Sequence, residues 1–131
     1  MTIKRSDSHS TEFGLWLRDQ PEIDSKLGYL ATNIDYVWRN WRTGEWMFIE
    51  EKRYKSPIKT WQKKTFFAVH RAIRDLKYKG FWCLFFENTN PEDGKMWLGR
   101  LGENVFEITK QELLDFLRFK DRQHAKGDED E

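Results

Sequence analysis

Cysteine, proline and long apolar runs are all scarce in this chain of 131 residues. The single cysteine, Cys83, excludes an internal disulfide and a zinc site built from several cysteines. It lies in the apolar run of residues 81–86, which predicts a buried, inert thiol rather than a nucleophile. No apolar run is long enough to cross a membrane, and the polar residues 1–10 show no signal-peptide pattern. We therefore expect a cytoplasmic protein with no membrane partner, and its small size would suit a phage or a mobile element.

Several common kinds of site are also without support in the sequence. His9, His70 and His124 lie in different settings and share no metal-ligand spacing. A glycine-rich phosphate loop and a Ser-His-Asp arrangement are not recognisable, and no repeats occur. His70 falls on an expected helix, where we interpret it as a partly buried residue without a catalytic role.

Large aromatic side chains, by contrast, are plentiful. The chain has seven Trp and ten Phe, although its hydrophobic content is only 38%. Large aromatics can close a small core beneath a charged surface. The length fits one domain, which we expect over residues 11–120, with disordered segments at 1–10 and 121–131.

Charge is unevenly distributed along the chain, although the net charge is only +1. Residues 52–79 contain ten Lys or Arg and one acid, Asp75, whereas residues 128–131 are all acidic. A segment of one sign of charge favours contact with a polyanion such as nucleic acid. The candidate nucleic-acid-binding residues are Lys55, Lys59, Lys63, Lys64, Arg71 and Arg74.

The order of apolar patterns predicts an α/β fold, in which a central mixed β-sheet with an early hairpin is flanked by helices. A first helix is expected over residues 11–18, capped by Ser10 or Thr11 and stopped by Pro21. The hairpin follows over residues 34–54, with its turn around 42–45.

A second helix is expected from Pro57 or Lys59 to about Tyr78, with Gly80 ending it. Trp61 and Leu76 belong to its predicted core stripe. Three strands follow, at 81–87, 95–101 and 105–108, the first of them parallel to its neighbour because a helix connects the two. A capping box at residues 109–112 opens the last helix.

The hairpin brings charged residues to one end of the predicted sheet. Asp35 begins its first strand, and Glu50, Glu51 and Lys52 end its second. Because side chains alternate along a strand, Glu50 and Lys52 share a face and Glu51 points away. The apolar run 46–49 indicates a strand buried on both faces, which places the charges at a sheet rim rather than on a solvated surface hairpin. Two acids there can hold a divalent metal.

Asp35 followed by Glu50-Glu51-Lys52 resembles the motif of the PD-(D/E)xK nuclease superfamily. Ile34 stands where the family usually has proline. The resemblance covers roughly residues 11–101 and implies a restriction-endonuclease-like fold, of the Holliday-junction-resolvase-like or the exonuclease-like branch. It implies a divalent-metal-dependent DNA phosphodiesterase, and within that class an endonuclease.

The resemblance also implies roles for individual residues. Asp35 and Glu50 bind Mg²⁺ or Mn²⁺, and the backbone carbonyl of Glu51 adds a ligand. The metal lowers the pKa of a bound water and neutralises charge on the phosphate. Lys52 holds or deprotonates that water and stabilises the transition state.

Two further residues are catalytic candidates by the same resemblance. Glu12 matches an acid that the resolvase-like branch carries on a helix before the first strand. The other interpretation of Glu12 is structural, since an acid is favoured at a helix N-terminus. Glu22 is the alternative candidate for the catalytic role. Gln62 begins Gln-Lys-Lys-Thr-Phe, close to the Gln-x-x-x-Tyr of the exonuclease-like branch; it is otherwise a plain surface residue.

Two other classes of function stay open. A non-catalytic nucleic-acid-binding module would use the basic helix and an exposed tryptophan for base stacking, and a subunit-interaction protein would dock through its aromatic surface. Trp38, Trp41 and Trp46 fit either base stacking or ordinary cross-strand packing. The chain is too small for a separate recognition domain. We therefore expect it to select its substrate by recognising DNA shape or junctions, by forming a homodimer, or through a partner protein. The form of the substrate, DNA or RNA, duplex, single-stranded or branched, does not follow from the sequence.

Overall fold

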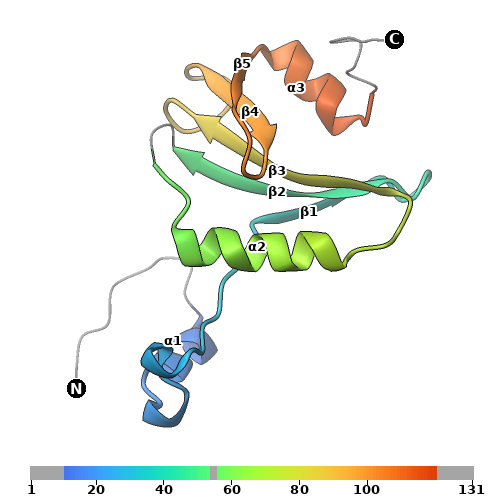
Figure 1. Ribbon diagram of the computed structural model, residues 1–131. Coiled ribbons are helices and arrows are strands. Elements are labelled where there is room, and N and C mark those ends of the chain that lie inside the picture. Colours follow the sequence, from blue (N-terminus) through green and yellow to red (C-terminus); the bar gives the residue numbers. More distant parts are fainter. Residues whose placement is uncertain (1–10, 54–55, 121–131) are drawn as a thin grey trace. The chain divides into compact units, whose positions relative to one another are not determined.

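The computed structural model describes residues 11–53 and 56–120 (Figure 1). The chain divides into two compact units, Met1–Asn33 and Ile34–Glu131. The expected disorder of residues 1–10 and 121–131, and the candidate Lys55, lie outside the described residues. That residues 11–120 act as one domain stays a prediction.

The first unit contains a short helix and two single turns. Helix α1 (Glu12–Arg18) begins where the sequence predicts, because the side chain of Thr11 accepts a hydrogen bond from the backbone N–H of Gly14. Pro21 opens the 3₁₀ turn η1 (Pro21–Ile23), and η2 (Ser25–Leu27) follows. No residue of α1 is buried.

The second unit is built on a five-stranded mixed sheet (Figure 1). Its strands are β1 (Tyr36–Arg39), β2 (Trp46–Arg53), β3 (Tyr78–Phe86), β4 (Met96–Arg100) and β5 (Phe106–Ile108). They lie side by side in the order in which they occur in the chain. Only β2 and β3 are parallel, and helix α2 (Thr60–Ala72) connects them. The predicted early hairpin and the predicted crossover are both confirmed.

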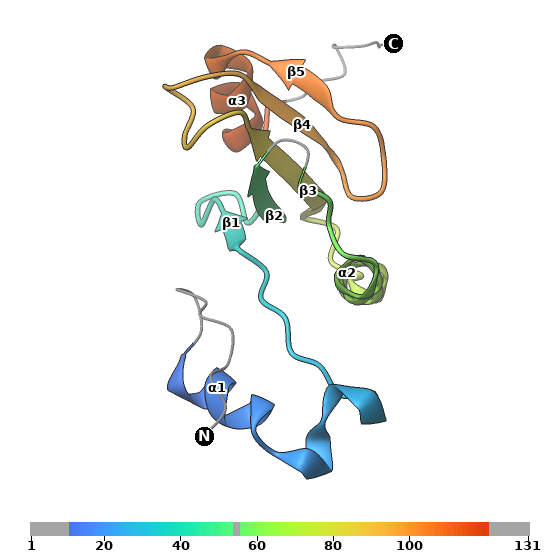
Figure 2. The same ribbon diagram turned by 90° about the vertical axis from the view of Figure 1, so that its left-hand side faces the viewer.

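Two apolar clusters cover the two faces of the sheet. On one face, Phe66 of α2 packs with Phe48 and Phe81. On the other, Met47 and Ile49 pack with side chains of helix α3 (Lys110–Leu117). Figure 2 shows the two helices on opposite sides of the sheet. Strand β2 is therefore buried on both faces, as the apolar run 46–49 predicts.

Helix α2 is shorter than predicted, because it ends at Ala72 rather than near Tyr78. The chain then turns at Asp75, whose carboxylate accepts the N–H of Lys77 and whose carbonyl accepts the N–H of Tyr78. The predicted core stripe was wrong at both ends, since Trp61 and Leu76 are exposed. Phe66 of α2 is fully buried in the core, and Phe67 and Val69 of the same helix pack against the same cluster.

Gly80 was predicted to end the second helix, but it lies inside β3. Its φ of +110° is one that side-chain-bearing residues rarely adopt. The register shifts at this point: Trp46 pairs with Tyr78, but Phe48 pairs with Phe81. The extra residue makes a β-bulge, a feature that glycine favours.

The end of the unit follows the sequence closely. Strands β4 and β5 lie within the predicted ranges. Thr109 and Glu112 form the predicted capping box, each side chain accepting the other's backbone N–H. Within residues 11–53 and 56–120, no helix combines the length and the apolar character needed to span a membrane.

Candidate active site

Asp35 and Glu50 lie side by side where β1 begins. The antiparallel register pairs Tyr36 with Ile49, so the preceding residue, Asp35, comes opposite Glu50. The backbone N–H of Asp35 donates to Oε1 of Glu50 at 3.2 Å. In return, Oδ2 of Asp35 accepts the backbone N–H of Glu51 at 2.9 Å. Each carboxylate is therefore held by the other strand.

Glu50 is an acid in an apolar place, with only 3% of its surface exposed. Burial, together with the negative charge of Asp35, raises its pKa to about 7. The N–H of Asp35 and the ammonium of Lys52 lower the pKa but do not cancel the effect of burial. At neutral pH the Glu50 carboxyl is therefore close to the midpoint of its titration.

Lys52 shares the sheet face of Glu50, as strand alternation requires. Its Nζ lies 3.9 Å from Oε2 of Glu50 and donates to Oε1 of Gln62 at 3.4 Å. Gln62 comes from the first turns of α2, which pack over this face. The structure thus brings Asp35, Glu50, Lys52 and Gln62 together, and Gln62 contacts the lysine rather than being only a surface residue.

Glu51 presents its side chain to the opposite face, where its Oε1 accepts the hydroxyl of Tyr36 at 3.3 Å. The charge of Glu51 raises the pKa of that tyrosine. Its backbone behaves differently, because its N–H points to Asp35. The N–H and C=O of one strand residue face the same neighbour, so the Glu51 carbonyl lies on the side of Asp35 as well.

Three oxygens at this point suit a hard divalent cation. Each carboxylate uses one oxygen in a hydrogen bond to backbone, which leaves Oδ1 of Asp35 and Oε2 of Glu50, and the Glu51 carbonyl is the third. Across the described residues no cluster combines three or more His, Cys, Asp or Glu side chains. A Mg²⁺ ion fits a smaller donor set, since it commonly binds one or two carboxylates and keeps several waters.

Glu12 and Glu22 belong to the first unit of the chain, whereas the group above belongs to the second. Glu12 lies on the first turn of α1 and Glu22 in η1, both in the first unit. The acid role that the resemblance gives to one of them stays a prediction.

The basic candidates divide into two groups. Lys59 precedes α2, and Lys63 and Lys64 are exposed in its first turns, which also carry Gln62. At the other end of α2, the guanidinium of Arg71 lies 4.9 Å from the centroid of the Phe67 ring. Arg74 lies beyond the end of α2, although the predicted helix included it, and donates to the backbone carbonyl of Arg71 at 2.6 Å.

Cys83 is buried directly opposite Glu50, on the neighbouring strand β3. Burial, and secondarily the charge of Glu50, raises the pKa of its thiol to about 12. Such a thiol stays protonated at neutral pH, which agrees with the predicted inert residue.

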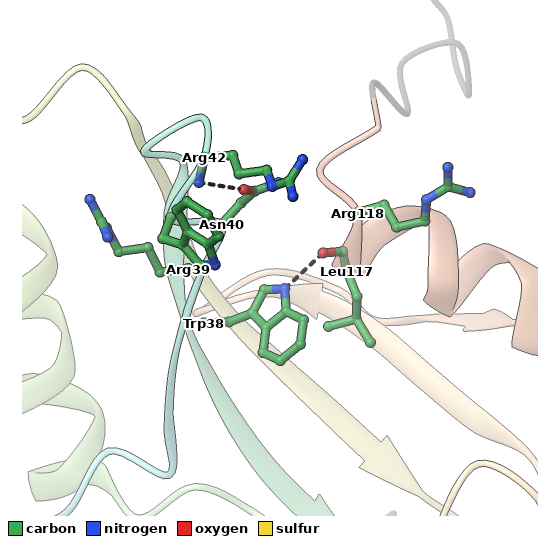
Figure 3. Close-up of a pocket in the computed structure, with 7 residues that line it drawn as sticks. Trp38, Arg39, Asn40, Arg42, Leu117 and Arg118 are labelled. Carbon is green, nitrogen blue, oxygen red and sulfur yellow. Dashed lines mark hydrogen bonds between the residues drawn. The ribbon is translucent and has the colours of Figure 1, made fainter.

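A pocket at the other end of the hairpin was missed by sequence reasoning (Figure 3). Its lining comes from the end of β1, the loop after it and the end of α3: Trp38, Arg39, Asn40, Trp41, Arg42, Leu117 and Arg118. The available signal was the alternation of tryptophan and arginine over residues 38–42. The contribution of α3 had no local signal, because the two segments are far apart in the chain.

Comparisons with protein-family models, with curated proteins and with solved structures find no match to this chain. The resemblance to the PD-(D/E)xK superfamily therefore depends on the residues of the motif alone. The site has to be interpreted from its own geometry.

Proposed function

We propose that this protein is a divalent-metal-dependent nuclease of the PD-(D/E)xK type, with a restriction-endonuclease-like fold. One observation carries the proposal: a buried carboxylate, Glu50, is held beside Asp35, with Lys52 on the same face. Burying one acid beside the charge of a second is costly for folding unless a cation or a proton compensates the charge. Such a cost is typical of a site kept for its chemistry.

The fold supports this proposal in a second way. A hairpin followed by a helical crossover to a parallel strand places Asp35 and Glu50 next to the first turns of α2. A phosphate arriving at the acids would meet the exposed Lys59, Lys63 and Lys64 of those turns. These lysines offset the repulsion between the acids and a polyanionic substrate.

The residues have distinct roles in the proposed hydrolysis. Asp35 and Glu50, with the Glu51 carbonyl, would hold Mg²⁺ or Mn²⁺. The bound cation would supply Lewis acidity, both toward a water and toward the phosphate. Lys52 would orient the attacking water and stabilise charge that develops on the phosphate. Gln62, which accepts from Lys52 at 3.4 Å, would position that ammonium.

The test is a cleavage assay on plasmid, single-stranded and branched DNA, with Mg²⁺, Mn²⁺ or EDTA. We expect cleavage with either metal, none in EDTA and none from the Asp35→Asn variant. Cleavage that Asp35→Asn leaves intact would indicate a contaminating nuclease. No cleavage of any substrate would overturn the proposal in favour of the alternative below.

The alternative is a non-catalytic nucleic-acid-binding module, in which the same lysines bind phosphate and the acids are structural. The observation in its favour is the exposure of Trp41, whose side chain is available for base stacking. A divalent metal separates the two functions, since only the nuclease binds Mg²⁺ or Mn²⁺ at Asp35 and Glu50.

A further inference from the structure

The pocket at the turn end of the hairpin has an unusual lining. Its volume is about 550 Å³, and it is bounded by two tryptophans, three arginines, Asn40 and Leu117. No acidic residue takes part. Indole faces combined with guanidinium groups form the kind of surface that binds single-stranded nucleic acid, by stacking bases and pairing with phosphates.

Trp38 forms a fixed wall of this pocket. Its indole N–H donates to the backbone carbonyl of Leu117 at 2.7 Å, which ties β1 to the end of α3 (Figure 3). Trp38 as a whole residue is nevertheless 42% exposed. A ring that is already held in place loses little conformational freedom when a ligand stacks on it.

Trp41 also lines the pocket and lies on an ordered turn. The side-chain oxygen of Asn40 accepts the backbone N–H groups of Arg42 and Thr43, at 2.9 Å and 3.3 Å. These bonds fix the turn, and yet the Trp41 side chain is 75% exposed. Such exposure of the largest apolar side chain, on a turn that is not loose, is typical of a contact residue.

The arginines of the pocket are not equivalent. Arg39 extends to the side away from Leu117 (Figure 3). The pKa of Asp75 is lowered mainly by the hydrogen bond from the N–H of Lys77, and the charge of Arg39 makes a small contribution. Arg42 and Arg118 remain at the pocket, and neither forms a salt bridge with another residue of the described ranges 11–53 and 56–120. They are the charges available to a phosphate.

We propose that this pocket binds an unpaired nucleotide of a DNA strand, with the base stacked on Trp41, which is the more exposed tryptophan, and the phosphate at Arg42 and Arg118. The choice of DNA rests on the proposed function, whereas the choice of an unpaired nucleotide rests on the pocket. A paired base has no free face to offer a tryptophan, so the pocket selects single-stranded or branched regions over intact duplex.

The pocket and the acids can contact the same DNA strand. Trp38 is three residues from Asp35 in the protein chain, which is about 10 Å along β1 at the usual rise per residue. Trp38 and Asp35 belong to opposite faces, but β1 is the edge strand of the sheet and leaves both faces reachable around that edge. The pocket would thus fix the position of the substrate relative to the cleaved bond.

The test measures binding in EDTA, by fluorescence anisotropy of a labelled oligodeoxythymidine, of an abasic strand of the same length and of a duplex. Trp41→Ala should weaken binding of the oligodeoxythymidine about tenfold and leave binding of the abasic strand unchanged, because only the former has bases to stack. Arg42→Ala with Arg118→Ala should weaken binding of both single strands. Phe106→Ala and Lys110→Ala, exposed residues on β5 and α3, are the matched controls and should bind like the parent.

An unchanged affinity of Trp41→Ala for oligodeoxythymidine overturns the proposal, as does an equal loss for the abasic strand or the duplex. A change in oligomeric state by sedimentation, without a change in DNA binding, would assign the pocket to a second copy of the chain instead. Trp41→Phe, which keeps an aromatic face, should retain most of the binding and so guards against a folding artefact. Because no metal is present, the result is independent of whether the protein cleaves DNA.

Discussion

Glu50 holds a proton in the folded protein under conditions where it would lose it in the unfolded chain. Its pKa rises from 4.5 to about 7 on folding. Between these values the native state binds more protons than the unfolded state, so stability falls as the pH rises from about 4.5 to 7. Above pH 7 this contribution is constant and unfavourable.

Glu50→Gln should therefore be more stable than the parent at pH 8. The expected difference is about 3 kcal/mol in the free energy of unfolding, from the size of the pKa rise. It should shrink toward zero below pH 4.5, where the parent is protonated in both states. Urea unfolding across this pH range measures it; a difference that does not vary with pH would show that the substitution acts through packing instead.

A divalent cation should counteract the same unfavourable charge. At pH 8, Mg²⁺ or Mn²⁺ should raise the melting temperature of the parent, because binding to the folded state alone stabilises it. At pH 5 the increase should be small, since the Glu50 proton competes with the metal.

Two variants that each remove one carboxylate test where the metal binds. Asp35→Asn should abolish the increase in melting temperature at pH 8. Glu51→Gln should retain it, because the side chain of Glu51 faces Tyr36 on the other side of the sheet. A metal effect that survives Asp35→Asn would place the ion elsewhere.

Lys52→Ala separates catalysis from binding. Cleavage should fall by ~10²-fold or more, as for the loss of one transition-state stabiliser, while DNA affinity changes little because many phosphate contacts remain. Lys52 also lowers the pKa of Glu50, so the residual activity should need a higher pH than that of the parent. Single-turnover rates across pH measure both effects.

The control for Lys52→Ala is Glu51→Ala, which should keep cleavage because only the backbone of Glu51 is needed. If Glu51→Ala abolishes cleavage and Lys52→Ala spares it, the assignment of Glu50-Glu51-Lys52 is wrong by one residue.

At the scale of elements, helix α2 contributes its basic charge mainly at its start. Lys59, Lys63 and Lys64 surround the turns that carry Gln62, whereas Arg74 is bonded back to the end of the helix. The first group is therefore better placed for phosphate contacts near the acids.

Replacing Lys59, Lys63 and Lys64 by Ala should reduce the salt dependence of DNA affinity. The slope of log affinity against log salt should lose roughly one unit per lost phosphate contact. Titrations at several salt concentrations measure the slope, and Lys26, Lys95 and Lys110 replaced together provide a control of equal charge. Equal slopes for the two triple variants would move the binding surface away from α2.

Most elements could be predicted because their signals are local. The capping box of Thr109 and Glu112, the apolar run 46–49 and the Thr11 cap each need only neighbouring residues. The predicted end of α2 was wrong because a glycine such as Gly80 fits both the end of a helix and a bulge in a strand. Only the pairing of β2 with β3 decides between them, and pairing is a property of the tertiary structure.

For the whole molecule, the limit of sequence reasoning is again distance along the chain. The pairing of Asp35 with Glu50 could be predicted, since a hairpin joins neighbouring strands. The hydrogen bond from Trp38 to Leu117 could not, because 79 residues separate the partners. The burial that raises the pKa of Glu50 likewise depends on tertiary structure, since Glu50 pairs with Cys83 of β3 and lies on the face of the sheet that α2 covers.

The sheet order has a consequence for how the chain is made. Each strand pairs with the next one to be synthesised, so the growing sheet can extend at one edge as the ribosome delivers it. Only the pairing of β2 with β3, which α2 connects, joins strands separated by more than a short loop. Low sequence separation between paired strands favours rapid folding. The hydrogen bond from Asp35 to Glu50 thus joins two residues that are made in close succession, only 15 positions apart in the chain.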